Sequence, residues 1–383
     1  MDLAFTRELR LDSLRSSAFI FGPRMTGKTT CLRGLKAVRY FDLLDPETEL
    51  RFRQTPRLFW EEINSLSRGS QIIIDEVQRI PALLDYVQRG IDQSEYRFLL
   101  SGSSARKLRR GGANLLGGRA LILKLHPLTI REIGKFEIAD ALQFGTLPKI
   151  HRLVLDGAPD EARRFLKSYV TTYLKEEIQA EALTRNLGAF QRFFAVAGQA
   201  HGQVIEYANI SRECSVPMST VKEYYQILED TLLGEFLWPF DRSERKKARP
   251  KFYFFDCGVA RALQNRLTDP PTPVERGTLF ESWFVRELVR IRDYEEKEHE
   301  FSFWRKGAHE VDLLVSGGHG PLLAIECKSG KGEVSPATVA AFRNDFPKVP
   351  LVVASLADDQ RRKLASGLEI LPWRIAIQKY RDL

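Results

Sequence analysis

The residues with the clearest chemistry form a glycine-rich loop near the start of the chain. Residues 22–29 read Gly-Pro-Arg-Met-Thr-Gly-Lys-Thr and fit the pattern G-x-x-x-x-G-K-S/T in full. An apolar run precedes the loop and a helical pattern follows it, which is the context that this pattern requires. Backbone N–H groups of such a loop wrap phosphates, and the start of the helix adds partial positive charge. The sequence therefore predicts a phosphate site with these members: Gly22, Gly27, Lys28, Thr29 and Thr30.

Two acids at the end of a later apolar run supply the rest of the chemistry of ATP hydrolysis. Residues 72–76 read Ile-Ile-Ile-Asp-Glu. We expect Lys28 to reach the β- and γ-phosphates of ATP, and Thr29 and Asp75 to hold Mg²⁺, Asp75 through water. Glu76 would orient the attacking water. Because two acids after an apolar run are common, this interpretation depends on the complete phosphate loop upstream.

The next apolar run ends in Ser-Gly-Ser-Ser at residues 101–104. Either Ser101 or Ser103 could sense the γ-phosphate, and the sequence does not decide between them. One of the arginines that follow could be an arginine finger that reaches a neighbouring subunit, which would make the protein a homo-oligomer. A solvated basic loop explains each arginine at least equally well. They are Arg106, Arg109, Arg110 and Arg119, of which Arg119 is grouped with the ATP-binding candidates.

Four residues in the last third of the chain have the types that a metal-dependent nuclease needs. Glu281 lies in a helical pattern, Asp312 in an apolar run, and Glu326-Cys-Lys328 ends the next run. Asp312 and Glu326 would bind Mg²⁺ with hard oxygens, and Lys328 would activate water or stabilise the phosphate. Glu281 would support the metal or its water. The set resembles the PD-(D/E)XK nuclease constellation. This resemblance implies a restriction-endonuclease-like fold with a metal site that could hold Mn²⁺ in place of Mg²⁺. The alternative is a domain that keeps this fold without activity.

A DNA-binding surface is predicted in the middle of the chain. Residues 187–240 have the pattern of a winged helix-turn-helix, but its second helix, 219–230, carries one lysine among several acids and suits phosphate contacts poorly. The charge run that follows, residues 242–249, suits them better. A charge run is usually a solvated face, yet here it follows a winged helix. The DNA-binding candidates are Arg242, Arg245, Lys246, Lys247 and Arg249.

The elements that must position these residues follow an α/β pattern. Short apolar runs alternate with helical stretches in the first third, which predicts a parallel sheet covered on both faces. The middle is helical, and a second α/β unit follows the proline-rich segment 269–273. We therefore expect a phosphate-loop ATPase core at 1–135, a helical lid with the winged helix at 136–268, and a nuclease-like domain at 269–383.

The composition limits the class of protein. The 383 residues include 58 Lys and Arg against 50 Asp and Glu, a formal charge of +8, and 43% are hydrophobic, which excludes a disordered polyelectrolyte. Four widely spaced cysteines predict neither a disulfide framework nor a zinc pair. No secretory signal or membrane-spanning run is recognisable, so we expect a cytoplasmic protein without a membrane partner.

Taken together, these blocks resemble a family of bacterial and archaeal AAA-type ATPases with a C-terminal domain of unknown function. The segments that carry the resemblance are GPRMTGKTT, IIIDEVQRIP, LLSGSSARKL, LHPLTIREI, SYVTTYLKEEI, RNLGAFQRFF, STVKEYYQILEDTLL and KFYFFDCGVARAL. The resemblance covers nearly the whole chain and implies ATP binding and hydrolysis. Glu177 departs from the aspartate expected there, without consequence for catalysis.

These observations favour an ATP-dependent enzyme that processes DNA, branched DNA included, and cuts it at the C-terminal site. The alternative is a nucleotide switch whose winged helix binds DNA and whose C-terminal domain is inert. A third interpretation is an ATP-driven scaffold that acts on proteins. Cleavage assays with Mg²⁺ separate the first interpretation from the others.

Overall fold

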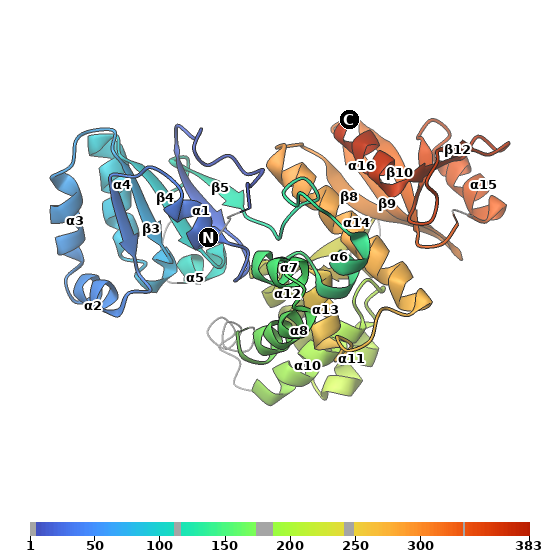
Figure 1. Cartoon of the computed structure of the whole chain (residues 1–383), viewed down its shortest axis with the longest axis horizontal. Helices are drawn as coiled ribbons and strands as arrows, with labels where there is room; N and C mark the ends of the chain where they lie inside the picture. Colours follow the sequence, from blue (N-terminus) through green and yellow to red (C-terminus); the bar gives the residue numbers. More distant parts are fainter. Residues whose placement is uncertain (1–4, 111–115, 174–186, 241–248, 332–333) are drawn as a thin grey trace.

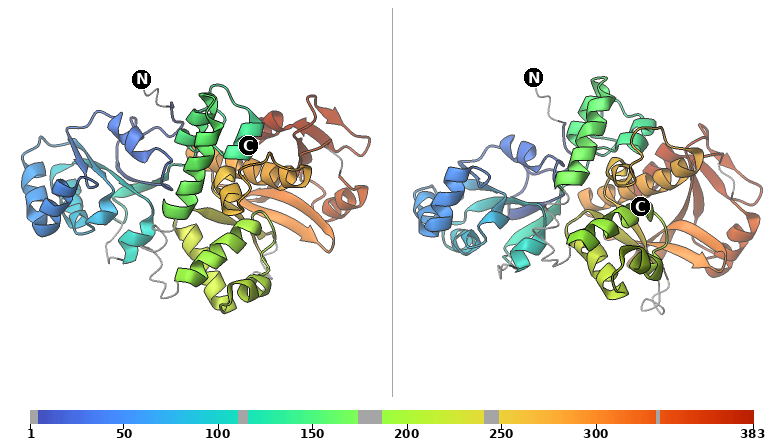
Figure 2. Two further views of the ribbon diagram at one scale, coloured as in Figure 1. Left: turned by 60° about the horizontal axis from the view of Figure 1, so that its bottom comes forward. Right: turned by 90° about the horizontal axis from the view of Figure 1, so that it is seen from below.

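The computed structural model describes residues 5–110, 116–173, 187–240, 249–331 and 334–383. Figures 1 and 2 show three units: an N-terminal sheet unit, a helical middle and a C-terminal sheet unit. Glu177 lies outside the described residues. No helix among the described ranges is long and apolar enough to cross a membrane.

The N-terminal unit is built on a sheet of five parallel strands in the order β2-β3-β4-β1-β5. The strands are β1 (Ser17–Phe21), β2 (Arg39–Asp42), β3 (Gln71–Asp75), β4 (Arg97–Gly102) and β5 (Ala120–Lys124). The helices are α1 (Lys28–Arg33), α2 (Pro46–Gln54), α3 (Pro56–Asn64), α4 (Leu83–Ser94) and α5 (Ala105–Arg110). Ile72, Ile73 and Ile74 are fully buried, as central strands covered on both faces require. The predicted parallel α/β core is confirmed.

This strand order brings the candidate ATP residues to one edge. β4 lies between β1 and β3, so the carboxyl ends of these three strands are neighbours. The phosphate loop follows β1, Asp75 ends β3, and Ser101 lies near the end of β4. Ligands of parallel α/β sheets bind outside the carboxyl ends of the strands.

The middle unit packs helices around an aromatic core. Its helices are α6 (Ile138–Phe144), α7 (Pro148–Leu155), α8 (Pro159–Ser168), a π-helical turn (Tyr169–Tyr173), α10 (Leu187–Gln199), α11 (Tyr207–Cys214), α12 (Met218–Asp230) and α13 (Cys257–Leu263). Phe193 meets Tyr225 edge to face with ring centroids 4.9 Å apart. Ser215, in the left-handed region at φ 54°, makes the tight turn between α11 and α12. The predicted helix-turn-helix is present.

The C-terminal unit contains an eight-stranded sheet in the order β12-β13-β11-β10-β9-β8-β6-β7. Its strands are β6 (Gly234–Pro239), β7 (Lys251–Phe254), β8 (Glu300–Lys306), β9 (His309–Gly317), β10 (Gly320–Lys328), β11 (Leu351–Ser355), β12 (Arg362–Lys363) and β13 (Glu369–Pro372). Its helices are α14 (Pro273–Tyr294), α15 (Pro336–Asp345) and α16 (Trp373–Arg381).

Two strands of this sheet come from before residue 269, where the sequence analysis divides the chain. β6 pairs with β7 as the wing of the helix-turn-helix, and it also pairs in parallel with β8, with Trp238 opposite Ser302. The pairing gives the backbone groups at the edge of β8 hydrogen-bond partners. The wing and the C-terminal unit therefore share one sheet, so the proline-rich segment does not separate independent structures.

Candidate functional site

The phosphate loop has the backbone that its glycines allow. Gly27 adopts φ +94°, which side chains rarely tolerate, and a Cβ on Gly22 would lie 2.3 Å from the carbonyl oxygen of Leu125. The Lys28 ammonium donates hydrogen bonds to the carbonyl oxygens of Gly22 (2.6 Å) and Pro23 (3.1 Å). The lysine is thus curled inside its own loop, where phosphate oxygens would replace these carbonyls. The other two candidates, Thr29 and Thr30, lie in the first turn of α1.

Asp75 is buried and hydrogen-bonded through both of its carboxylate oxygens. It is fully buried, and its Oδ2 accepts a hydrogen bond from the Tyr40 hydroxyl at 2.7 Å. Burial and the hydrogen bond to Asp75 raise the pKa of Tyr40, so the phenol stays a donor. Oδ1 accepts from the Ser101 hydroxyl. Tyr40, which supports the acid from the neighbouring strand β2, was missed in the sequence analysis.

Ser101 connects the two acids. Its hydroxyl donates to Asp75 and accepts a hydrogen bond from the backbone N–H of Glu76 at 2.9 Å. Glu76 has a left-handed backbone, φ 60°, before the short 3₁₀ turn Val77–Arg79, and its carboxylate accepts from the Gln78 amide. The Ser103 hydroxyl is also buried, but among the described residues it has no hydrogen-bond partner. Ser101 is therefore engaged in supporting the acids, whereas Ser103 remains able to bind a phosphate oxygen.

We expect Ser101→Ala and Ser103→Ala to differ in stability. Ser101→Ala leaves Asp75 Oδ1 and the Glu76 N–H without this partner in the interior, which costs about 1–3 kcal/mol of unfolding free energy. Ser103→Ala removes a hydroxyl that already lacks a partner, so the change should be near zero. Urea denaturation without nucleotide measures both. Equal losses would contradict the bridging role of Ser101.

Among the arginine candidates, the structure describes the side chains of Arg106 and Arg119, and each is paired away from the phosphate loop. Arg119 immediately precedes β5, at the amino edge of the parallel sheet, and its Nε lies 2.8 Å from Asp92 near the end of α4. The ATP-binding assignment of Arg119 is therefore not met within one chain, and contact with nucleotide would need a second copy. Arg106 pairs with Asp230 of α12. The homo-oligomer stays a prediction.

The four C-terminal candidates come together where the central strand β9 begins and its neighbour β10 ends. The Asp312 Oδ2 accepts a hydrogen bond from the Cys327 N–H at 2.9 Å, and the Asp312 N–H lies 3.4 Å from Glu326 Oε2. The Lys328 ammonium donates to Glu326 Oε1 at 2.7 Å. Glu281 reaches the same place from α14, because it and Asp312 both contact the ammonium of Lys251. The hairpin spacing thus predicted this neighbourhood correctly.

A fifth residue, Lys251 of β7, was missed in the sequence analysis. Its ammonium lies 2.7 Å from Glu281 Oε1, 2.8 Å from Glu310 Oε1 and 3.5 Å from Asp312 Oδ1. The Tyr253 hydroxyl donates to the same oxygen of Glu281. The signal in the sequence was a single lysine that opens the otherwise apolar run 251–255.

Burial and crowding shift the ionisation of this cluster. Burial, together with the charge of Asp312, raises the pKa of Glu281 to about 7 and that of Glu326 to about 8, against the opposing effects of Lys251 and Lys328. Burial opposes the charge of Lys251, but Tyr253 and the surrounding carboxylates outweigh it and raise its pKa. The lysine therefore stays an ammonium at neutral pH.

The carboxylates do not form the predicted metal site. Within the described ranges, no group of three or more His, Cys, Asp or Glu side chains is arranged to hold a metal ion. Mg²⁺ requires carboxylate oxygens at about 2.0–2.1 Å in near-octahedral geometry. Here the ammonium of Lys251 lies between Glu281 and Asp312, and that of Lys328 is bound to Glu326. The residues as arranged do not fit Mg²⁺ or Mn²⁺.

The comparison with known families agrees with the geometry of the first site. Residues 15–134 match a family model described as an AAA domain. This part of the chain is therefore similar to AAA domains. Two further models, each described as a domain of unknown function, match residues 135–269 and 276–375.

The relatives found by sequence have no described function. Uncharacterized proteins of Mycobacterium bovis and Mycobacterium tuberculosis are each 28% identical over 306 residues, covering 77% of this chain and 66% of theirs. An uncharacterized protein of Methanocaldococcus jannaschii is 22% identical over 285 residues, covering 68% of this chain and 62% of its own. The chain thus spans slightly less than two thirds of the length of these relatives.

Two solved structures share a weak overall likeness. The Aeropyrum pernix ORC1 protein in complex with DNA has a TM-score of 0.32 and 13% identity, covering 65% of this chain and 86% of that one. The replication initiator DnaA, bound to AMPPCP and single-stranded DNA, has a TM-score of 0.28 and 17% identity, covering 57% and 84%.

The predicted DNA contacts lie mostly outside the described residues. Arg242, Arg245, Lys246 and Lys247 fall there, in the sequence between β6 and β7. Arg249 is described and pairs with Glu206. On α12, the Lys222 ammonium lies 5.3 Å from the centroid of the Tyr207 ring, beside the exposed Glu223. The described face of α12 therefore adds little positive charge, so the run between the wing strands remains the candidate.

Proposed function

We propose that this chain is an ATP-hydrolysing AAA protein whose nucleotide state is coupled to a DNA-binding winged-helix unit. The observation that carries the proposal is the meeting of Lys28, Asp75, Glu76 and Ser101 at the carboxyl edge of one parallel sheet. MgATP is the substrate. Lys28 would bind the β- and γ-phosphates, Asp75 and Thr29 would hold the metal end, and Glu76 would orient water.

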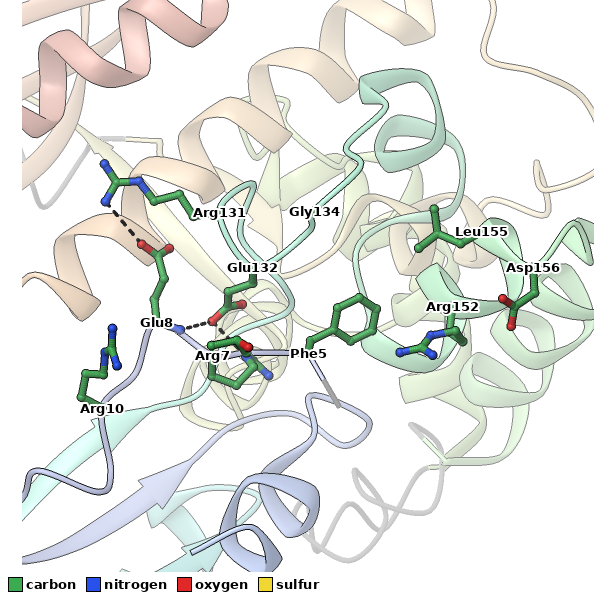
Figure 3. A pocket seen from close by; sticks show the side chains of 11 residues that line it. Phe5, Arg7, Glu8, Arg10, Arg131, Glu132, Gly134, Arg152, Leu155 and Asp156 are labelled. Carbon is green, nitrogen blue, oxygen red and sulfur yellow. Dashed lines mark hydrogen bonds and ion pairs between the residues drawn. The ribbon is translucent and has the colours of Figure 1, made fainter. Parts of the chain in front are cut away.

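A cavity of about 740 Å³, lined by residues from 5–10, 131–134 and 152–156 and not by the loop itself, is the candidate place for the base and ribose of ATP. Figure 3 shows Arg7 and Glu132 at its centre, with Phe5 and Arg152 on one side. Arg7 donates to the carbonyl oxygen of Thr26 in the loop at 2.7 Å, so the cavity adjoins the phosphate site. The volume lies in the range of small-molecule sites and leaves room for the base and ribose of ATP.

Direct contacts between the AAA domain and the winged helix support the coupling. Arg106 of α5, the helix that follows the β4 edge, pairs with Asp230 at the end of α12. Leu232, just after α12, packs against the hydrophobic core of the AAA domain. Movement at the end of β4 upon hydrolysis would therefore reach α12 and the wing.

The assay that tests this proposal is DNA-stimulated ATP hydrolysis. We expect duplex DNA to raise the rate of phosphate release by the wild type and to leave Glu76→Gln inactive. A rate that no duplex, branched or single-stranded DNA changes would contradict coupling to DNA. The comparison of Glu76→Gln with the wild type would still test ATP hydrolysis, because it does not depend on DNA.

Neutralising two lysines between the wing strands should weaken DNA binding for all sequences alike. The double change Lys246→Gln with Lys247→Gln should reduce the slope of log affinity against log salt by about two, because each lost phosphate contact removes roughly one released counterion. Fluorescence anisotropy at several salt concentrations measures the slope. Lys306→Gln is the control, since Lys306 at the end of β8 pairs with Asp345 of α15 in the C-terminal unit. An unchanged slope would show that the run is only solvated.

Metal-dependent DNA cleavage, the first interpretation of the sequence, is not part of this proposal. Lys251 and Lys328 already compensate the carboxylates that would bind the metal. We therefore favour the nucleotide-switch alternative, in which the C-terminal domain does not cut. Linear, supercoiled and four-way-junction DNA with Mg²⁺ or Mn²⁺ tests this, and cutting that Asp312→Ala abolishes would restore the nuclease interpretation. A cytoplasmic location stays a prediction.

A further inference from the structure

The Lys251 ammonium has the surroundings that a metal ion would have in the predicted nuclease. It bridges Glu281, which comes from α14, and Asp312, which comes from β9, at 2.7 and 3.5 Å. A third carboxylate, Glu310, lies 2.8 Å away. We propose that Lys251 takes the place of the divalent cation and makes this cluster a metal-independent joint between the wing and the C-terminal domain.

The ammonium is held in place by its strand. The Lys251 side chain is only 5% exposed. Its backbone lies opposite Leu237 of β6 on one side and forms a bridge with Val204 on the other. The neighbouring carbonyl oxygens of Pro250 and Phe252 accept hydrogen bonds from Ile205 and Gly202, each at 2.9 Å. A lysine on a strand paired along both edges is a fixed part of the site, unlike a lysine on an exposed loop.

One oxygen of each of these carboxylates is already engaged in a hydrogen bond. Glu281 Oε1 accepts from both Lys251 and the Tyr253 hydroxyl, and Asp312 Oδ2 accepts from the Cys327 N–H. Glu326 Oε1 is bound to the second ammonium, that of Lys328. A dication bound between Glu281 and Asp312 would lie against a fixed, like-charged ammonium, which low dielectric surroundings make unfavourable.

The lysine also connects separate elements of the fold, as a bound metal ion would. It joins β7, α14 and β9, elements on both sides of the segment 269–273. Uncompensated buried carboxylates repel each other, and the ammonium relieves this repulsion where the three elements pack. ATP hydrolysis and DNA binding are separate from this proposal, because the residues that carry it belong neither to the phosphate loop nor to the run 242–249: Lys251, Glu281, Glu310 and Asp312.

Counting bound Mn²⁺ tests the proposal on the nucleotide-free, full-length protein. Electron paramagnetic resonance reports the free Mn²⁺ during a titration. We expect the wild type and Asp312→Asn to bind the same number of ions, because the cluster contributes no site. An additional wild-type site that Asp312→Asn removes would overturn the proposal, and this comparison does not depend on any change at Lys251.

Removing the ammonium should create the metal site. Lys251→Met is expected to gain one Mn²⁺ ion that binds at least about tenfold more tightly than any ion bound by the wild type. The double change with Asp312→Asn should lose that ion. The melting temperature of Lys251→Met should fall in EDTA and recover with Mn²⁺, whereas the control Lys306→Met should show neither effect. A folded Lys251→Met that gains no site would overturn the assignment of the lysine to the metal position.

Discussion

Replacing Glu76 by glutamine is expected to leave ATP binding intact and to slow ATP hydrolysis by at least about 10²-fold. Glutamine has nearly the same shape but does not accept a proton from the attacking water. The backbone N–H of Glu76 would still donate to Ser101, so the loop after β3 should keep its position. Binding of a fluorescent ATP analogue and single-turnover phosphate release measure the two quantities separately.

A matched control and a second variant make this result specific. Glu61→Gln makes the same change at an exposed pair with Arg57 and should leave turnover unchanged. Lys28→Ala, in contrast, should weaken ATP binding itself, because this ammonium lies among the carbonyl oxygens that line the loop. Normal turnover in Glu76→Gln would contradict the assignment of this carboxylate as the group that orients water.

Removing the buried Glu287 should cause the largest loss of stability. Its side chain on α14 is fully buried, accepts a hydrogen bond from the Ile130 N–H at 3.0 Å and pairs with Arg290 at 3.2 Å. Arg290 in turn donates to the carbonyl oxygen of Leu128 at 2.9 Å. Glu287→Ala leaves a buried guanidinium without its carboxylate, which costs about 3–5 kcal/mol of unfolding free energy.

The same network connects the segment after β5 to the C-terminal unit, so its loss should also be visible locally. Urea denaturation measures the global change, and hydrogen exchange at Ile130 should become faster. Arg57→Ala is the control, because this pair with Glu61 is exposed and contributes less than about 1 kcal/mol. If Glu287→Ala were as stable as Arg57→Ala, water would be replacing the carboxylate as the partner of the Arg290 guanidinium, and the predicted loss would be wrong.

Much of the first site could be predicted from the sequence because its chemistry is local. The phosphate loop needs glycines at two positions for close approach and a left-handed backbone, and those needs appear directly as residue types at Gly22 and Gly27. The apolar run before Asp75 predicts a central parallel strand, because a strand covered on both faces needs apolar residues at consecutive positions. Both features depend on residues that are adjacent in the sequence, so the sequence alone is enough to predict them.

The roles of the supporting residues depended on which strands are neighbours. Ser101 could be distinguished from Ser103 only after β4 was found between β1 and β3, where the Ser101 hydroxyl meets Asp75 and Glu76. Arg119 could be placed at the opposite edge of the sheet only from the direction of β5. Sheet order is a long-range property, and no spacing along the chain encodes it.

The C-terminal cluster shows the same division most clearly. The spacing of Asp312, Glu326 and Lys328 determined that these side chains share a hairpin, because two adjacent antiparallel strands bring their residues together. Only the tertiary structure decided what lies among them. Lys251 arrives through the pairing of β6 with β8, strands separated by about sixty residues of sequence. A cation stabilises a buried carboxylate cluster, but the sequence alone does not say whether a metal or a distant lysine supplies it, because that depends on which strand completes the sheet.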